Sequence, residues 1–470
     1  MTSVTKLSLE KVGSDSGLTC QSRLLFYLCV YCINLCMFVK YVRDPVHGYV
    51  GMTDIERRVV DTWPIQRLRG IKQLSIAYVV YPGGDHTRFT HALGTMHVAG
   101  QIADALKRNI DISDDEWQLI RLAGLLHDIG HGPFSHSYEE ILMKYRRMNH
   151  EQMGEEVVKK SRLADTLKEC GFMPDEITEL AFGKKEGGKR YLHQVVASQV
   201  DADKLDFLVR DSYFTGVEYG RIDISRLVQA MDIHGEDIAI DLKALYALEA
   251  FMIARYEMFL AVYYHHAVRA AEILLHKAMD YAHELAGLTT FNDVGEFQKM
   301  DDAYVTIKLR ELDPRNFDQA ERQLVERAKN MMNRLDAREL LKSAYQRDVH
   351  IRDPYVAKLL GDEAVRHQKE VEIAGLAGVD PDDVVVDVPT LDSIPYYPRE
   401  IDPMEIPVIR IAGGGKKELV QLSQYSRLIN VLKGYVDIIR VYTLPEHRTE
   451  VERAAADVFK TLPFAAQISM

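Results

Sequence analysis

The chain has 470 residues, of which 47% are hydrophobic and 27% are charged, so it can bury a full-sized core and is not disordered as a whole. Its formal net charge of -12 at pH 7 argues against a broad electrostatic contact with DNA or RNA, which needs many Lys and Arg side chains. We therefore expect no stable binding to duplex nucleic acid. A small anionic ligand remains compatible with this charge, provided that basic side chains converge locally.

Residues 1–39 form an apolar extension that we separate from the folded part of the chain. The run from Leu24 to Val39 is 16 residues long, whereas a membrane-spanning helix needs about 20. It contains Asn34 and lacks a small-residue cleavage site, so we expect neither a membrane anchor nor a signal peptide. A flexible extension, or a true translation start at Met37, would also explain it. Four of the five cysteines lie here, a pattern that fits a reducing cytoplasm better than a disulfide framework: Cys20, Cys29, Cys32 and Cys36. The last three have no His or fourth Cys nearby, so we interpret them as small apolar residues and not as metal ligands.

Residues 40–285 show the apolar periodicity of helices almost throughout, interrupted by short loops rich in Gly and Pro. One helix start is explicit, because Ser113 and Glu116 have the spacing of a capping box. The apolar positions that follow place His127 on the buried face of the same helix. We therefore predict an all-helical domain over this range.

The composition changes after residue 285. A charged stretch with helical character continues to about Gly361, and three short runs rich in β-branched residues follow at 383–388, 406–411 and 437–443. These runs predict strands. We therefore expect a C-terminal α+β region over residues 286–470 and a mainly α fold for the chain as a whole.

Histidines are concentrated in one region, and the adjacent pair His127–Asp128 is its most informative part. The pair ends an apolar helix, and Gly130 follows at once, so both side chains can turn towards one point. His91 offers a third metal ligand and Asp203 a fourth. Imidazole and carboxylate ligands suit Mn, Fe, Zn or Mg, and four of them leave room for a water molecule and a substrate oxygen, as metal-assisted hydrolysis requires.

The order of these candidate ligands, H…HD…D, resembles the HD superfamily, whose members bind divalent metals and cleave phosphoesters. Six motifs, in the same order, are similar to those of the deoxynucleoside triphosphate (dNTP) triphosphohydrolases related to the human SAM- and HD-domain enzyme. They are RDPVHGYV (43–50), DTWPIQRLRGIKQL (61–74), YPGGDHTRFTHALG (81–94), LLHDIGHGPFSHSYE (125–139), NHEQMG (149–154) and DADKLDFLVRDSYFTG (201–216).

The resemblance covers about residues 40–285, which would then be an all-helical HD-domain core. It implies one divalent metal, Mn, Fe, Mg or Zn, held by His91, His127, Asp128 and Asp203, with Mg accompanying the nucleotide. The implied reaction is hydrolysis of a dNTP to a deoxynucleoside and inorganic triphosphate.

The resemblance also implies roles for individual residues in this reaction. His150 and Glu151 match a His–acid pair placed for proton transfer at the α-phosphate, and His131 matches a position beside the phosphates. A His near its ordinary pKa suits general acid work at neutral pH, although His150 taken by itself could be an ordinary surface residue. Nine further positions match substrate-binding residues: Gln73, Leu74, Arg88, His136, Lys204, Phe207, Asp211, Arg255 and Tyr263.

Helical spacing supports several of these roles. Asp203, Phe207 and Asp211 recur every four residues and so lie on one stripe of a helix. That stripe would align a metal ligand, a ring against the sugar and an acceptor for the sugar 3'-hydroxyl. Arg88 shares a helix face with His91, where it could hold a phosphate. Phe207 stands where we expect Tyr in the human enzyme, so the ring is kept and a hydroxyl is lost.

Four more residues match a regulatory site: Lys40, Asp61, Gln66 and Arg69. In activated members of the family the matching positions bind a guanine nucleotide between subunits, whereas their plain interpretation is a solvated helix face with ion pairs. We therefore expect a homo-oligomer, a tetramer, with GTP or dGTP as activator. No SAM domain is expected, because the 39 residues before Lys40 are too few to form one.

Two other functions remain open at this stage. One is a different HD-domain phosphohydrolase activity, on cyclic nucleotides, alarmones or single-stranded nucleic acid. The other is a nucleotide-sensing protein without turnover. The identity of the leaving product and metal-dependent turnover would separate these alternatives.

Overall fold

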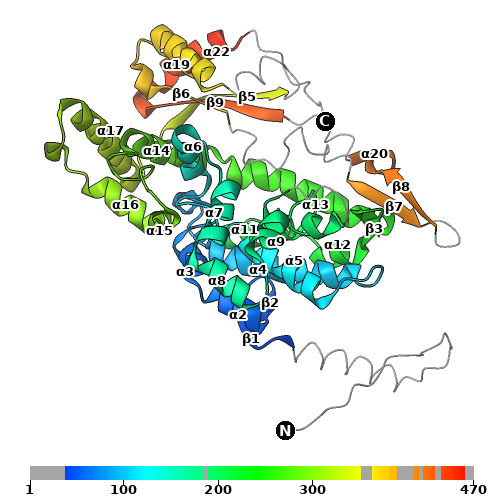
Figure 1. Ribbon diagram of the computed structural model, residues 1–470. Coiled ribbons are helices and arrows are strands. Elements are labelled where there is room, and N and C mark those ends of the chain that lie inside the picture. Colours follow the sequence, from blue (N-terminus) through cyan, green and yellow to red (C-terminus); the bar gives the residue numbers. More distant parts are fainter. Residues whose placement is uncertain are drawn as a thin grey trace, which may run out of the picture.

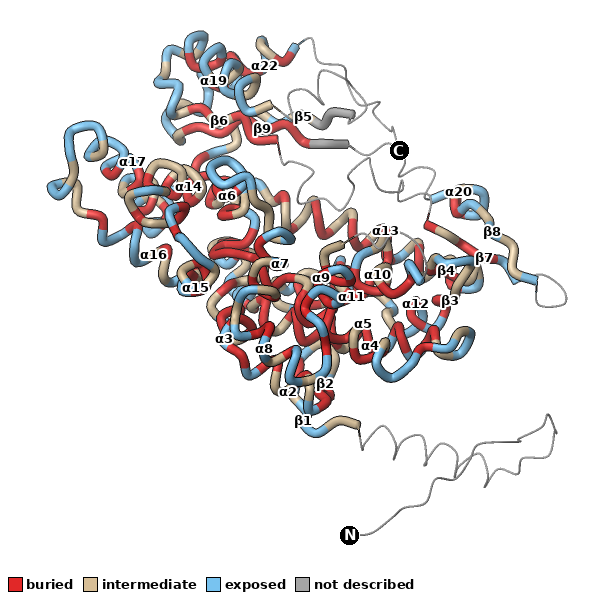
Figure 2. The backbone as a smooth tube through the Cα atoms, viewed as in Figure 1, coloured by how far each residue is buried: buried red, intermediate tan, exposed pale blue. Residues whose placement is uncertain are grey.

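The structure is a computed structural model that describes residues 37–183, 189–350, 362–388, 406–411, 416–428 and 436–460. Most of these residues form helices packed around a buried centre, with small sheets towards the periphery (Figures 1 and 2). The mainly α fold class is thereby confirmed. The four N-terminal cysteines and most of the apolar run at 24–39 lie outside the described residues. None of the described helices combines the length and the apolar character that crossing a bilayer requires.

The described chain begins with a β-hairpin, which the helical periodicity did not predict. Strands β1 (Lys40–Asp44) and β2 (Gly48–Met52) pair antiparallel. The turn forms because Asp44 Oδ1 accepts hydrogen bonds from the backbone N–H groups of Val46 and His47, both at 2.9 Å, and Gly48 adopts a φ of +77°. Two short helices follow, α2 (Asp54–Val60) and α3 (Trp63–Arg67).

A group of helices forms the centre of the molecule, where α4 packs against both α5 and α11. The capping box predicted at the start of α5 is confirmed, because the Ser113 side chain accepts from the Glu116 N–H and the Glu116 side chain accepts from the Ser113 N–H. The bounds in this group are α4 (Arg88–Leu106), α5 (Asp114–Leu126), α6 (His136–Arg146), α7 (His150–Lys160), α8 (Arg162–Glu169), α9 (Pro174–Ala181), α10 (Tyr191–Gln194) and α11 (Ala202–Thr215).

A second hairpin, also absent from the sequence-based prediction, follows α12 (Ile224–Ala230). Its strands β3 (Met231–His234) and β4 (Asp237–Asp241) turn at Gly235, which has a φ of +66°. Two later strands, β7 (Pro407–Ile411) and β8 (Lys417–Gln421), extend it to a sheet of order β3-β4-β7-β8, in which β4 and β7 are parallel. After β4 come α13 (Leu245–Met258), a π-helical turn (Phe259–Tyr263) and α14 (His266–Ala282).

The remaining elements form helices beside α14 and a small α+β layer. Helices α15 (Val294–Phe297), α16 (Asp302–Glu311) and α17 (Gln319–Asp336) precede β5 (Lys342–His350), so the helical stretch expected up to Gly361 ends earlier. Strand β9 (Val436–Thr443) lies between β5 and β6 (Val385–Asp387) in an antiparallel sheet. Helices α19 (Glu363–Ala377) and α22 (Arg448–Val458) pack against this sheet (Figure 1), and α20 (Leu422–Tyr425) follows β8.

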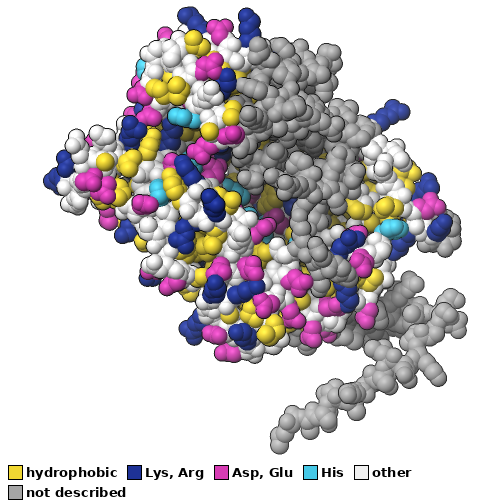
Figure 3. All heavy atoms as spheres, turned by 45° about the horizontal axis from the view of Figure 1, so that its top comes forward, with side chains coloured by type: hydrophobic (Ala, Val, Ile, Leu, Met, Phe, Trp, Pro, Cys, Tyr) yellow, Lys and Arg dark blue, Asp and Glu magenta, His cyan; other side chains and the backbone are white. Residues whose placement is uncertain are grey.

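The three strands predicted at 383–388, 406–411 and 437–443 are confirmed as β6, β7 and β9. One cluster of buried apolar side chains contains residues on both sides of position 285, including Leu275 and Leu341. The predicted domain boundaries near residues 39 and 285 therefore stay predictions. On the face shown in Figure 3, basic and acidic side chains are mixed with scattered apolar ones over the described residues.

Candidate functional site

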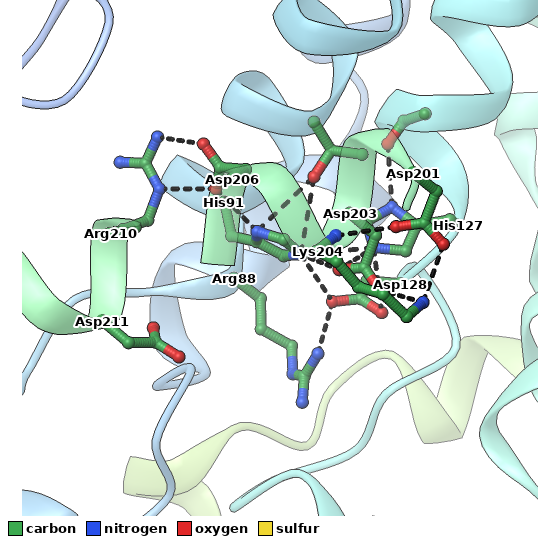
Figure 4. A network of polar contacts seen from close by, with 12 residues as sticks. Arg88, His91, His127, Asp128, Asp201, Asp203, Lys204, Asp206, Arg210 and Asp211 are labelled. Carbon is green, nitrogen blue, oxygen red and sulfur yellow. Dashed lines mark hydrogen bonds and ion pairs between the residues drawn. The ribbon is translucent and has the colours of Figure 1, made fainter. Parts of the chain in front are cut away.

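Three helix ends bring four of the predicted ligands together (Figure 4). His91 lies in the first turn of α4, His127 and Asp128 directly follow α5, and Asp203 lies in the first turn of α11. His91 Nε2 is 3.0 Å from Asp203 Oδ1 and 3.2 Å from His127 Nε2. Asp128 Oδ1 is 3.3 Å from His127 Nε2, and its Oδ2 is 3.6 Å from His91 Nε2. The structure therefore brings the four predicted ligands close together, and His91, His127 and Asp203 form a group that could hold a metal ion.

The hydrogen bonds of the two imidazoles show that this cluster fits a cation. His91 Nδ1 faces Asp206 Oδ2 at 2.7 Å, and His127 Nδ1 faces the carbonyl oxygen of Gly124 at 2.8 Å. Both partners accept, so each Nδ1 must donate, and in the neutral rings both Nε2 atoms carry lone pairs. Two lone pairs facing each other at 3.2 Å would repel, so a positive charge, either a proton or a metal ion, must lie between them.

The charged groups at the site also favour a bound cation. Burial lowers the pKa of His91, but hydrogen bonds to Asp203 and Asp206 and the surrounding carboxylates outweigh it and raise this pKa to about 10. Burial opposes ionisation of Asp203, yet its hydrogen bonds to His127 and His91 hold its pKa below the ordinary value. Burial opposes ionisation of Asp128 as well, and Arg88 and the neighbouring His residues lower its pKa in spite of this. The carboxylates are therefore ionised and favour a bound cation.

Two predicted phosphate-binding cations lie against the acidic side chains of this cluster. The Arg88 guanidinium donates to Asp128 and, through Nε, to Ser135 Oγ at 2.7 Å. Lys204 Nζ donates to Asp201 Oδ2 at 2.7 Å and lies 4.0 Å from Asp203 Oδ2. Both positive charges are thus held within reach of any ligand that approaches the cluster.

A second cluster joins the predicted catalytic histidines. The rings of His131 and His150 stack with centroids 4.1 Å apart, and His136 lies edge-on to His131 at 5.3 Å. Glu139, on α6, bridges the group: its Oε1 is 2.6 Å from His150 Nδ1, and its Oε2 is 3.2 Å from His136 Nδ1. His131 Nε2 lies 3.4 Å from Asp128 Oδ1, so this cluster adjoins the first one.

The acid that pairs with His150 differs from the predicted one. Glu151 is exposed, and no hydrogen bond or ion pair between it and His150 occurs in the described part of the chain. Adjacent residues of a helix point in directions about 100° apart and cannot face each other. Glu139 takes this place instead. It lies three residues after His136, a helical spacing in the sequence that could have suggested it.

The predicted sugar-binding residues also meet. The Tyr263 hydroxyl donates to Asp211 Oδ2 at 2.7 Å, and His86 Nε2 lies 2.7 Å from the other oxygen, Oδ1. Asp211 has an exposed fraction of 2%. Burial and the negative charge of Asp211 raise the pKa of Tyr263 well above its ordinary value, so its hydroxyl remains a donor. His86 was not predicted, although it lies inside the motif that contains His91.

The other residues of this predicted pocket lie around the pair. The Phe207 and Tyr263 rings meet edge-on at 6.2 Å. Gln73 donates its backbone N–H to the carbonyl oxygen of His86 at 2.9 Å. Leu74 packs against the same apolar cluster as Phe207. Arg255 is buried, and its positive charge opposes the rise in the pKa of Tyr263.

Three of the four predicted regulatory residues lie close together. Gln66 donates to the carbonyl oxygen of Val60 at 2.7 Å, and Arg69 donates to Gln66 Oε1 at 2.9 Å. Asp61, the C-cap of α2, is exposed and pairs with Arg57 at 3.4 Å. Lys40 is exposed on β1, a different element. The plain interpretation of a solvated, hydrogen-bonded surface therefore remains open.

Comparison with known proteins places this site in a family. A family model for the HD domain matches residues 88–208, and one for the HD associated region matches residues 222–468. The chain is 35% identical over 254 residues to the protein YwfO of Bacillus subtilis, an alignment that covers 52% of this chain and 56% of YwfO. It is 31% identical over 278 residues to a protein of Dictyostelium discoideum named deoxynucleoside triphosphate triphosphohydrolase SAMHD1 homolog, covering 56% of this chain and 54% of that protein. These alignments span about half the length of the curated relatives.

Two solved structures are similar over nearly their full length. A hypothetical protein from Aquifex aeolicus has a TM-score of 0.67 at 27% identity, covering 88% of this chain and 99% of the other. A phosphohydrolase from Bacteroides thetaiotaomicron has a TM-score of 0.66 at 26% identity, covering 86% and 99%. Because the HD associated region alone matches more than half of the chain and lies C-terminal to the HD-domain match, this chain belongs to the family of HD-domain proteins that carry the HD associated region.

Proposed function

We propose that this protein is a metal-dependent phosphohydrolase that converts a dNTP to a deoxynucleoside and inorganic triphosphate. The observation that carries the proposal is the placement of two sites on one helix. Asp203 of α11 belongs to the metal cluster, and Asp211, two turns later, is held by Tyr263 and His86. A candidate site for phosphate chemistry and a buried acceptor that would bind a sugar hydroxyl therefore lie on one helix, which supports the proposal.

Family membership and the names of similar proteins support the reaction class. Proteins named deoxynucleoside triphosphate triphosphohydrolase and phosphohydrolase occur among the similar proteins. A divalent metal held by His91, His127, Asp128 and Asp203 would supply Lewis-acid activation of water and of the α-phosphate. Imidazole with carboxylate ligands is compatible with Mn, Fe, Zn or Mg.

Side chains around the cluster would bind the phosphates and transfer the proton. Arg88 and Lys204, already beside the cluster, would exchange their carboxylate partners for triphosphate oxygens, and Arg255 would add a third positive charge. His150, oriented by Glu139, would protonate the leaving 5'-oxygen. His131 and His136 would contact the phosphates from the same side.

We also propose a homo-oligomer, a tetramer, that is activated by GTP or dGTP through Lys40, Asp61, Gln66 and Arg69. The contact between Gln66 and Arg69 supports a shared site. A nucleotide bound between subunits would favour the oligomer by mass action.

The test is a product assay on the full chain with a panel of dNTPs, ribonucleotides and cyclic nucleotides, each with Mn²⁺ or Mg²⁺ and with or without GTP. Release of inorganic triphosphate and deoxynucleoside is the expected result. Pyrophosphate and monophosphate as products, or turnover of a cyclic nucleotide in place of dNTPs, would overturn the proposed reaction. Nucleotide binding without any turnover would point to a sensing protein.

A further inference from the structure

A buried carboxylate lies behind the proposed metal ligand His91. Asp206 Oδ2 is 2.7 Å from His91 Nδ1, and both side chains are fully buried. Asp206 is not placed to hold a metal itself, because its oxygens already contact His91 and Arg210 (Figure 4) and also His47. By accepting the Nδ1 proton, Asp206 fixes the tautomer in which His91 Nε2 carries the lone pair for the cluster.

Asp206 is in turn held by two side chains. Arg210 donates to both of its oxygens, through Nε to Oδ2 and through Nη2 to Oδ1, each at 2.8 Å. His47 Nε2 lies 2.6 Å from Oδ1. A buried carboxylate with these partners keeps its orientation, whereas the loss of one partner leaves charge that burial penalises.

The network continues into the β1–β2 hairpin. Arg210 Nη1 donates to Asp44 Oδ2 at 2.8 Å, while Asp44 Oδ1 caps the hairpin turn through the N–H groups of Val46 and His47. One turn residue thus anchors Arg210 and also places His47. The hairpin turn is thereby linked to Arg210, which holds Asp206, and Asp206 accepts a hydrogen bond from the proposed ligand His91.

The packing at Gly94 leaves room for this network. Gly94 lies three residues after His91 on α4, and a Cβ there would overlap Asp206 Oδ1 and Arg210 Nη2. Only glycine lets the ion pair of α11 approach α4 so closely. The local sequence, with glycine one helical turn beyond the histidine, therefore fits the geometry that the network requires.

We propose that the β1–β2 hairpin is a working part of the metal site, in which Asp44 and His47 position Asp206 and Arg210, and Asp206 positions His91. Metal affinity then depends on a hairpin that contributes no metal ligand. The inference rests on the proposed role of His91 as a ligand and is independent of which nucleotide is hydrolysed.

The test compares Mn²⁺ binding to full-length variants by calorimetric titration, together with the visible absorption spectrum of Co²⁺-loaded protein. Asp44→Asn keeps an oxygen for the hairpin turn and replaces the carboxylate oxygen that accepts from Arg210 with an amide NH2, which cannot accept. The turn is retained, so the variant is expected to fold. Asp44→Asn and His47→Ala should each weaken Mn²⁺ binding by about 10-fold or more and shift the Co²⁺ bands. His47→Gln, which retains a donor, should recover part of the affinity.

The matched control is Tyr49→Phe. It removes the hydrogen bond from Arg43 to the Tyr49 hydroxyl on the exposed side of the same hairpin and should leave affinity and spectrum unchanged. If Asp44→Asn and His47→Ala bind Mn²⁺ as Tyr49→Phe does while His91→Ala loses the metal, the hairpin's role is wrong and the metal site stands. If His91→Ala also binds normally, the proposed metal site itself is wrong.

Discussion

His150 Nδ1 lies 2.6 Å from Glu139 Oε1, and the backbone N–H of His150 donates to the same oxygen at 2.9 Å. Burial lowers the pKa of His150, but the hydrogen bond and the charge of Glu139, with smaller contributions from Asp128 and Glu151, raise it above its ordinary value. The protonated ring is therefore favoured and oriented, as a general acid requires.

Glu139→Gln should move the alkaline limb of the pH–rate profile to lower pH. The proposed acid works only when protonated, and removing the Glu139 charge lowers the pKa of His150, so activity is lost at a lower pH. A shift of about one pH unit corresponds to the loss of about 1.4 kcal/mol of interaction with the protonated ring. Glu151→Gln should move the limb less. A larger effect of Glu151→Gln would restore the pairing suggested by adjacency in the sequence.

Asp128→Ala and Asp203→Ala should each lose bound metal and activity while remaining folded, because each removes a ligand and its charge. Metal content measured by mass spectrometry on the purified variants checks this, with circular dichroism as the test of folding. Stoichiometric metal in either folded variant would contradict the ligand set.

The contact between Tyr263 and Asp211 predicts how the sugar is recognised. A 3'-deoxy nucleotide should bind the wild type more weakly by about 1 to 3 kcal/mol, because a charged acceptor loses a donor. Asp211→Ala should show little such difference. Competition experiments measure both affinities, and equal losses in the two proteins would mean that the hydroxyl is recognised elsewhere.

Asp61→Ala should abolish stimulation by GTP or dGTP and leave metal binding intact. The Asp61 carboxylate can accept from the two donors of the guanine Watson–Crick edge, which adenine lacks. The measurement is the dNTPase rate of nucleotide-stripped protein, with ATP as the comparison. A wild-type rate that does not respond to guanine nucleotide would leave these residues as a charged surface.

Asp302 should make stability depend on pH. Burial raises its pKa to about 6, although the N–H groups of Lys72 and Phe134 donate to it. The folded state therefore binds this proton more tightly than the unfolded state does. Its stabilising effect is complete below about pH 4 and is lost as the pH rises through about 6, a difference of about 3 kcal/mol. Denaturant unfolding of wild type and Asp302→Asn at pH 4 and 7 checks this; identical pH dependence in both would exclude it.

The sequence alone was sufficient to locate the main helices and the residues that the structure brings together in the candidate metal cluster. Helical periodicity and the Ser113–Glu116 capping box are local properties of the sequence, so they can be recognised without knowledge of the packing. His127–Asp128 stands at a helix end followed by glycine, and the H…HD…D order named His91 and Asp203 correctly as its spatial neighbours. Three late strands were also predicted, because short runs of β-branched residues identify strands locally.

Tertiary structure alone decided which of the 70 acidic residues faces which histidine. His150 pairs with Glu139 of α6 and not with its neighbour Glu151, because successive helical residues diverge while packed helices bring distant ones together. His91 of α4 likewise pairs with Asp206 of α11, because these two helices pack against each other. The β1–β2 hairpin depends on an Asp44 side chain that caps its own turn and also meets Arg210, which lies 166 residues later. Such pairings depend on how helices pack against one another. A periodic pattern of apolar residues carries no information on which helices pack together or on how closely they approach.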